Sequence, residues 1–360
     1  FGPIAGRVTG WMFLGTVPVG APLVALVGAQ YVASVIPMPP VAVTGLAALL
    51  LGVSLWLNAG GVELSSRVQM GVVGLIALLL GGAVVLSLPY MEISDFRLFA
   101  PRGWLHVGTA GLLVFWCFVG WEVVAHLAEE FRQPQRDVPL SLVLAALIVG
   151  ALYTATALVT VGTGAYGQGG GLTPLRQLVA RGFGHLAGDV TAGLALFISF
   201  GTIHTNIAGF SRMVYARARE GDFPRVFAVL HPVSRTPRAA LVGLGTAFAA
   251  VLSFCVVFRP NLGNFMLWPG VAFLVLYTVT MAAALKLLPK GDPGRPMAAI
   301  SFAVCVGLYP FSGWACLYPA TLAAVGALTG LVALRRRRQT GSRPVAASTR
   351  EDAHSSRSKA

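Results

Sequence analysis

Ten long apolar runs constrain this chain more than any other feature of its sequence. They lie near residues 11–36, 40–58, 68–88, 105–130, 139–163, 187–212, 238–258, 262–288, 296–310 and 313–334. A helix that crosses the hydrocarbon core of a bilayer needs about 20 mostly apolar residues, and nearly all of these runs have that length. The runs do not alternate polar and apolar residues as the strands of a membrane barrel do. We therefore predict an all-α integral membrane protein with ten transmembrane helices.

The composition excludes a water-soluble protein of ordinary design. Of the 360 residues, 56% are hydrophobic and only 11% are charged, whereas soluble domains carry about 25% charged residues. The four cysteines lie inside apolar runs and have neither the spacing of a metal site nor that of a disulfide framework. We expect no disulfide and no metal or other cofactor.

The distribution of Lys and Arg along the chain predicts how the protein is oriented in the membrane. Alternating the ten runs across a membrane places 21 of the 26 Lys and Arg residues on one side and five on the other. Because cytoplasmic loops carry an excess of Lys and Arg, we predict that both termini are cytoplasmic. This distribution argues against a nucleic-acid partner. Residues 1–334 are the predicted membrane domain, and residues 335–360, which begin with four arginines, are a predicted disordered basic tail. That tail either binds anionic lipid or simply stops transfer after the last helix.

Glu122 is the one residue of the thirteen acidic ones that lies well inside an apolar run. A charge near the centre of a membrane helix costs about 2.5–3.5 kcal/mol on insertion scales. Such a carboxyl group needs a partner, a wet cavity or a raised pKa. It serves either in proton coupling and substrate binding or as an internal polar clamp. His126 lies four residues later on the same helix face. It serves either as a proton relay or as an interfacial residue near the helix end.

Gly120 lies two residues before Glu122, between the bulky Phe118 and Trp121. Many transporters break a membrane helix near the middle of the bilayer, where the freed backbone groups bind substrate or ion. We interpret residues 105–130 as two half-helices that meet near Val119 and Gly120. The alternative is a glycine that only lets two helices pack closely.

Two further motifs have weaker implications. The run 187–212 carries a polar patch of Ser199, Thr202, His204, Thr205 and Asn206, in which Thr202 and Asn206 share a helix face. These side chains either line a cavity or join helices through hydrogen bonds. Residues 162–167 match G-x-G-x-x-G, but they follow a membrane helix and enter a loop, which is the wrong context for a dinucleotide site. We find no catalytic constellation and do not expect an enzyme.

Three segments together resemble one known family. The first is Phe-Trp-Cys-Phe-Val-Gly-Trp-Glu at 115–122, with Ala-His-Leu-Ala-Glu-Glu-Phe at 125–131 and Pro-Gln-Arg-Asp-Val-Pro at 134–139. The others are Ser-Arg-Met-Val-Tyr-Ala at 211–216 with Glu-Gly-Asp-Phe-Pro at 220–224, and Arg-Val-Thr-Gly-Trp-Met-Phe-Leu at 7–14. They resemble the amino acid–polyamine–organocation transporter superfamily, and most of all its bacterial L-methionine/branched-chain amino acid exporters. The resemblance extends to about residue 334.

The resemblance implies a fold of twelve helices, of which the first ten form two inverted five-helix repeats. The ten runs look like helices three to twelve, so we expect the first two helices of the family to be absent from this sequence. Inverted-repeat transporters carry a broken helix in each half, and only run 105–130 qualifies here. The sequence then looks like a fragment of a longer frame that lacks half of its binding site.

The resemblance also implies roles for individual residues. Trp116 and Val119 would offer backbone carbonyl groups to a substrate amine, while Trp116, Cys117 and Phe118 would border the substrate side chain. Glu122 would couple transport to protons. Asn206 stands where some relatives have a pocket-lining aromatic residue, which leaves its role open. With Gly120 and Thr202, these residues are the predicted substrate site.

The resulting functional hypothesis is a secondary transporter of a bacterial plasma (inner) membrane. It would export neutral apolar amino acids, namely L-methionine, leucine, isoleucine and valine, in exchange for protons. One alternative is an uptake permease or amino acid exchanger on the same scaffold. The other is a non-transporting membrane relative, although such a protein gains nothing from a costly central carboxyl group.

Overall fold

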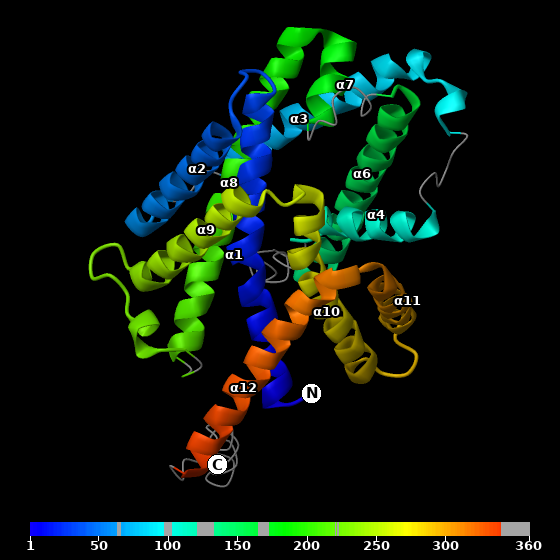
Figure 1. Cartoon of the computed structure of the whole chain (residues 1–360). Coiled ribbons are helices and arrows are strands. Elements are labelled where there is room, and N and C mark those ends of the chain that lie inside the picture. The colour runs from blue at the N-terminus through cyan, green and yellow to red at the C-terminus, as the bar shows by residue number, and fades with distance from the viewer. Residues whose placement is uncertain are drawn as a thin grey trace.

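The computed structural model describes residues 1–62, 66–96, 103–120, 133–164, 173–219, 221 and 223–339, and every regular element in these ranges is helical. Helix α1 (Pro3–Ala33) runs through the centre of the molecule (Figure 1). Among the described elements, its most extensive contacts are with five helices: α2 (Pro40–Gly60), α8 (His185–Arg219), α9 (Arg238–Phe258), α10 (Leu262–Leu287) and α12 (Leu317–Gln339). Of its most apolar 18-residue window, 72% is buried inside the protein.

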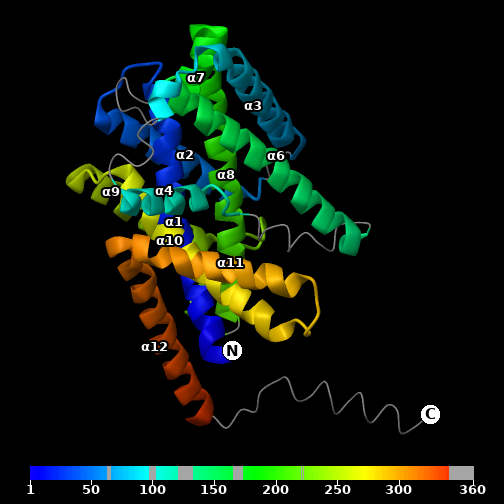
Figure 2. The ribbon, with the colours of Figure 1, turned by 90° about the vertical axis from the view of Figure 1, so that its right-hand side faces the viewer.

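The helices pack as three groups, each with its own buried apolar cluster. The first group is α1, α2, α8 and α9. The second comprises α3 (Ser66–Ser87), α6 (Pro134–Gly162) and the short α7 (Pro174–Phe183), which lie together in Figures 1 and 2. The third comprises α4 (Trp104–Trp116), α10 and α11 (Gly294–Leu308). Helices α1 and α10 share a further apolar cluster around Leu23 and Phe265, which joins the first group to the third.

The ends of these helices follow local sequence signals. Helices α1, α2, α6 and α7 each have a proline at their first positions, where the missing N–H costs nothing and the fixed φ favours a helix. Helix α2 ends at Gly61 with a φ of 77°, the left-handed cap that glycine adopts without strain. Asn261 caps α10 by accepting a hydrogen bond from the Asn264 amide at 3.2 Å.

Two prolines interrupt the hydrogen-bond ladder of the central helix. Pro18 and Pro22 lie inside α1. Each lacks the N–H that would bond to the carbonyl four residues earlier. The helix nevertheless continues to Ala33, because its neighbours pack around it on most sides.

The predicted helical architecture is confirmed at the level of class and of run positions. Each of the ten apolar runs contains a helix in the described part of the chain. Eight helices there are long and apolar enough to cross a membrane, while α4 with 13 residues and α11 with 15 are shorter. The predicted tail boundary at residue 335 falls inside α12, which continues to Gln339. Residues 340–360 lie outside the described ranges.

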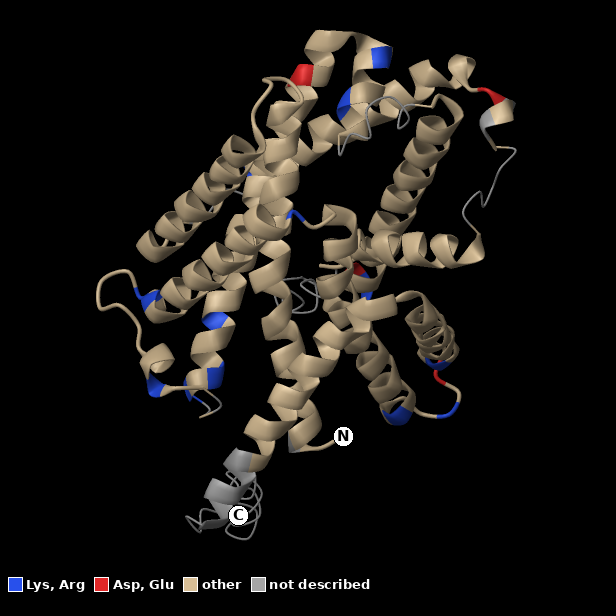
Figure 3. Ribbon diagram, viewed as in Figure 1, with Lys and Arg blue, Asp and Glu red and all other residues tan. Residues whose placement is uncertain are grey.

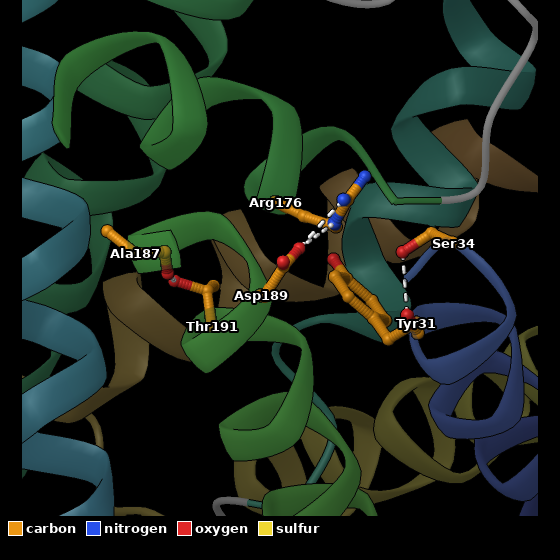
Figure 4. Close-up of polar contacts among 6 residues, drawn as sticks. All are labelled: Tyr31, Ser34, Arg176, Ala187, Asp189 and Thr191. Atoms are coloured by element: carbon orange, nitrogen blue, oxygen red, sulfur yellow. Dashed lines mark hydrogen bonds and ion pairs between the residues drawn. The ribbon is translucent and has the colours of Figure 1, made fainter. Parts of the chain in front are cut away.

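Helix α7 is an element that the apolar runs did not predict. Its ten residues pack against α8 and α3, and its buried contacts are made by Leu178 and Val179. Figure 4 shows Arg176 of α7 paired with Asp189 of α8, with 2.8 Å between Nη2 and Oδ1, beside the ring of Tyr31 from α1. The two charged side chains are 22% and 38% exposed. The ion pair therefore adds little stability, and apolar packing holds α7 in place.

Candidate functional site

Helix α4 ends in the middle of the predicted run 105–130. Its last helical residue is Trp116. Turn hydrogen bonds between residues three positions apart follow, from the Phe118 amide to the Phe115 carbonyl at 3.0 Å and from the Val119 amide to the Trp116 carbonyl at 3.2 Å. Gly120 then has a φ of 115°, which residues with a side chain rarely adopt. The backbone therefore leaves the helical path where the sequence predicted a break. The predicted second half-helix, with Glu122 and His126, lies outside the described residues.

This turn borders a cavity of about 440 Å³ at the point where the three helix groups meet. Helices α1 and α8 come from the first group, α3 from the second, and α10 with the turn after α4 from the third. Twenty residues line it: Phe13, Thr16, Val17, Gly20, Ala21, Val24, Gln69, Val72, Val73, Trp116, Val119, Gly120, Phe197, Ile198, Gly201, Thr202, Ile203, Thr205, Asn206 and Phe273. The described lining contains no charged side chain.

Five of the predicted substrate-site residues line this cavity, and two do not. Trp116, Val119, Gly120, Thr202 and Asn206 are among its lining residues. The Phe118 ring instead packs edge-on against Tyr153 of α6, with the ring centroids 5.6 Å apart. Cys117 is exposed, and its thiol points back to the Leu113 carbonyl oxygen at 3.9 Å. The turn thus separates Trp116, which faces the cavity, from its two successors.

Three aromatic rings of the cavity wall contact one another. Phe273 of α10 meets Phe13 of α1 at 6.0 Å and Trp116 at 6.1 Å between centroids, both in edge-to-face geometry. Gly20 of α1 makes room for the indole, because a Cβ atom there would lie only 3.0 Å from Cη2 of Trp116. Phe13, Gly20 and Phe273 were not predicted as site residues. Each lies in a long apolar run, where nothing in the sequence separates a cavity-lining side chain from a lipid-facing one.

The polar groups of the cavity are all uncharged. Thr16 and Thr205 donate to carbonyl groups of their own helices, at 2.7 Å to Phe13 and 3.0 Å to Gly201. The Asn206 amide donates to the Thr202 carbonyl at 2.9 Å, so its own amide oxygen can still accept a bond from a substrate amine. Gln69 of α3 adds a further amide that the sequence did not single out.

The polar patch of run 187–212 divides between the two roles considered for it. Thr202, Thr205 and Asn206 line the cavity. Ser199 lies against α1, where a Cβ atom on Gly28 would meet Ser199 Cβ at 2.8 Å. His204 is buried and bonds to α2 instead. One face of α8 therefore serves the cavity, while other positions join helices.

Comparison with known proteins gives the family. The model of the amino acid permease family matches residues 1–333. An uncharacterized amino acid permease of Bacillus subtilis, YecA, is 45% identical over 89% of this chain and 76% of its own length. The L-methionine/branched-chain amino acid exporter YjeH of Escherichia coli is 28% identical over 94% and 79%. The branched-chain amino acid permease BcaP of Bacillus subtilis is 26% identical over 71% and 56%. The chain belongs to the amino acid permease family of the amino acid–polyamine–organocation superfamily.

Proposed function

We propose that this permease carries neutral apolar amino acids, namely L-methionine, leucine, isoleucine and valine, out of a bacterial cell across its inner membrane. The observation that carries the proposal is the cavity lining. Aromatic and aliphatic side chains form most of its wall, and Thr202, Asn206 and Gln69 supply uncharged polar groups. Such a lining suits an apolar side chain attached to a zwitterion. It offers no described charge to a second ionic group, which argues against acidic or basic substrates.

The relatives support an overlapping range of substrates. YjeH and BcaP are both named for branched-chain amino acids, and YjeH is also named for L-methionine. An apolar pocket distinguishes substrates that differ by one methylene group by only about 1–3 kcal/mol. We therefore propose one site that accepts all four amino acids.

The proposed orientation places both termini in the cytoplasm. Figure 3 shows Lys and Arg gathered toward the end of the molecule that holds the start of α1, including the ends of α8 and α10 and the loops that follow them. This distribution is the one that the excess of positive charge in cytoplasmic loops produces. The helices would then correspond to helices three to twelve of the inverted-repeat fold.

An export assay tests the proposal directly. Cells that express the full-length gene product are fed dipeptides containing methionine or leucine, and free amino acids in the medium are followed over time. Faster release of methionine and branched-chain amino acids than in cells with an empty vector is the expected result. Equal release with the protein present in the membrane would contradict export. Uptake measured in the same cells then tests the alternative of a permease or exchanger, which the name of BcaP favours.

Glu122 is proposed as the group that couples transport to protons. Glu122→Gln keeps the size of the side chain but removes its titration, so transport should be lost or become insensitive to pH while membrane insertion is unchanged. The matched control is Glu92→Gln, the same change at an exposed position between helices. Initial export rates between about pH 5 and 8, the range in which carboxyl groups with raised pKa values titrate, provide the measurement. Export that remains pH-dependent in Glu122→Gln would refute the coupling role.

A further inference from the structure

The end of α2 is held from two sides by polar contacts. On one side, Thr236 of the loop between α8 and α9 donates its hydroxyl hydrogen to the Ala59 carbonyl at 3.0 Å. On the other side, His204 of α8 contacts Asn58 and Val62. His204 is 3% exposed and Asn58 is 7% exposed, so their polar atoms depend on each other rather than on solvent.

The orientation of the Asn58 amide is fixed by two backbone carbonyl groups. Its Nδ2 lies 2.9 Å from the Ser54 oxygen and 3.3 Å from the His204 oxygen. Carbonyl oxygens only accept hydrogen bonds, so the atom that faces them must be the NH₂ nitrogen. The same Nδ2 lies 3.0 Å from Nδ1 of His204. The Ser54 hydroxyl group also faces this ring nitrogen, with 3.4 Å between Oγ and Nδ1. An NH₂ group and a hydroxyl group can both donate to Nδ1, which therefore serves as an acceptor.

The contacts of both ring nitrogens assign the tautomer of His204. A neutral imidazole with an accepting Nδ1 carries its hydrogen on Nε2. Nε2 lies 2.9 Å from the carbonyl oxygen of Val62, to which it donates. The Phe200 ring stacks beside the imidazole, with the ring planes inclined by 28°. Both ring nitrogens thus have hydrogen-bond partners. Nδ1 bonds to α2 through Asn58, and Nε2 bonds to Val62, the residue after the cap of α2.

Val62 is the last described residue before α3, and α3 forms one wall of the cavity. Three residues separate Val62 from Ser66, where α3 begins, so the two points are at most about 14 Å apart. Gln69, Val72 and Val73 of α3 line the cavity together with Thr202 and Asn206 of α8. The Gln69 side chain packs beside this part of α8, because a Cβ atom on Gly201 would lie 3.9 Å from its Cδ atom. His204 is on that same helix, only two residues from each of these polar groups.

We propose that His204, through the bond from Nε2 to Val62, is a positioning residue that fixes the start of α3, and with it Gln69, relative to the polar face of α8. It does not touch the cavity itself. It keeps the two uncharged polar walls at the spacing that a bound zwitterion needs. The part of this inference that is tested by transport rests on the proposed function.

Two substitutions distinguish the effect of the hydrogen bond to Val62 from the effect of the other contacts of His204. In His204→Gln, the side-chain amide reaches the position of Nε2 and can donate to Val62, but it has no acceptor at the position of Nδ1. In His204→Asn, the shorter amide can accept from Asn58 but does not reach Val62. Both variants lose the stacking on Phe200. A role in packing alone predicts the same behaviour for both.

Amide hydrogen exchange on the purified protein tests the proposal without transport. Peptides that cover residues 58–75 should exchange roughly tenfold faster in His204→Asn than in His204→Gln, because the Val62 carbonyl has lost the donor that ties this segment to α8. Peptides from α12 should be unchanged and serve as the internal control. Equal exchange in the two variants would overturn the proposal.

The kinetic readout is the KM for L-leucine. We expect a rise of roughly tenfold in His204→Asn and a value within about twofold of the unmodified protein in His204→Gln, as loss of one hydrogen bond to a buried group predicts. An equal change in both variants would overturn the positioning role. If the unmodified protein transports none of the four amino acids, the proposed function fails, while the exchange experiment still decides the inference about α3.

A measurement on the unmodified protein covers the case in which His204→Asn fails to fold. The ¹⁵N chemical shifts of histidine-labelled protein distinguish the two neutral tautomers, and His204→Gln identifies the signal. A hydrogen on Nε2 is the expected result. A hydrogen on Nδ1 would exclude donation to Val62 and overturn the proposal.

Discussion

Gly20→Val is expected to reach the membrane in normal amounts and to transport amino acids roughly tenfold more slowly than the unmodified protein. A Cβ atom at this position would lie 3.0 Å from Cη2 and 3.5 Å from Cζ2 of Trp116. The two methyl groups of valine extend beyond that point. They would displace the indole from its edge contact with Phe273 and fill part of the cavity.

The matched control for this prediction is Gly52→Val in α2. Gly52 is exposed, and a Cβ atom there would meet nothing within 4 Å. Both substitutions introduce the same β-branched residue into a helix, so they share the change in helix propensity. Initial transport rates are divided by the amount of protein in the membrane. Equal rates for the two variants would show that the contact between Gly20 and Trp116 is unimportant for transport.

The second large effect is expected at the contact between α1 and α12. Gly326 of α12 packs so closely that a Cβ atom would lie 2.9 Å from the Cα atom of Val8 and 3.3 Å from Cβ of Trp11. Because the first of these neighbours is backbone, a larger residue can be accommodated only if the two helices separate. Gly326→Leu should therefore destabilise the protein by about 1–3 kcal/mol, the usual cost of overpacking.

Thermal unfolding in detergent measures this loss, with Gly45→Leu as the control. Gly45 is exposed on α2 and has nothing within 4 Å of its Cβ position. A lower Tm for Gly326→Leu than for Gly45→Leu is the expected outcome. Identical values would mean that α12 can shift away from α1 without loss of stability.

The sequence predicted the helices well because membrane spans are defined by length and hydropathy. The ten runs coincide with helices to within a few residues at most ends that the structure describes. Helix α7 was missed because its ten residues are amphipathic and too short to form an apolar run. Its place is determined by packing of Leu178 and Val179 in the apolar cluster shared with α3 and α6.

The cavity was predicted only where polar residues or glycine marked it. Thr202, Asn206 and Gly120 stand out in apolar surroundings, and the resemblance added Trp116 and Val119. Phe13 and Phe273 could not be identified in this way, since apolar residues cover both the lipid-facing and the inner sides of these helices. Cys117 and Phe118 were placed by their proximity to Trp116 in the sequence. The tight turn after α4 directs them elsewhere.

The prolines of α1 have a mechanical consequence. The carbonyl groups of Leu14 and Pro18 each lack the amide donor that an ordinary residue at positions 18 and 22 would supply. Thr16, Val17, Gly20 and Ala21 of the intervening segment line the cavity. Among the membrane-length helices that the structure describes, α1 is the most enclosed, and it is least resistant to bending at the level of the cavity. A small change in the angle between its two halves would alter the width of the cavity while the packed ends stay in register with their neighbours.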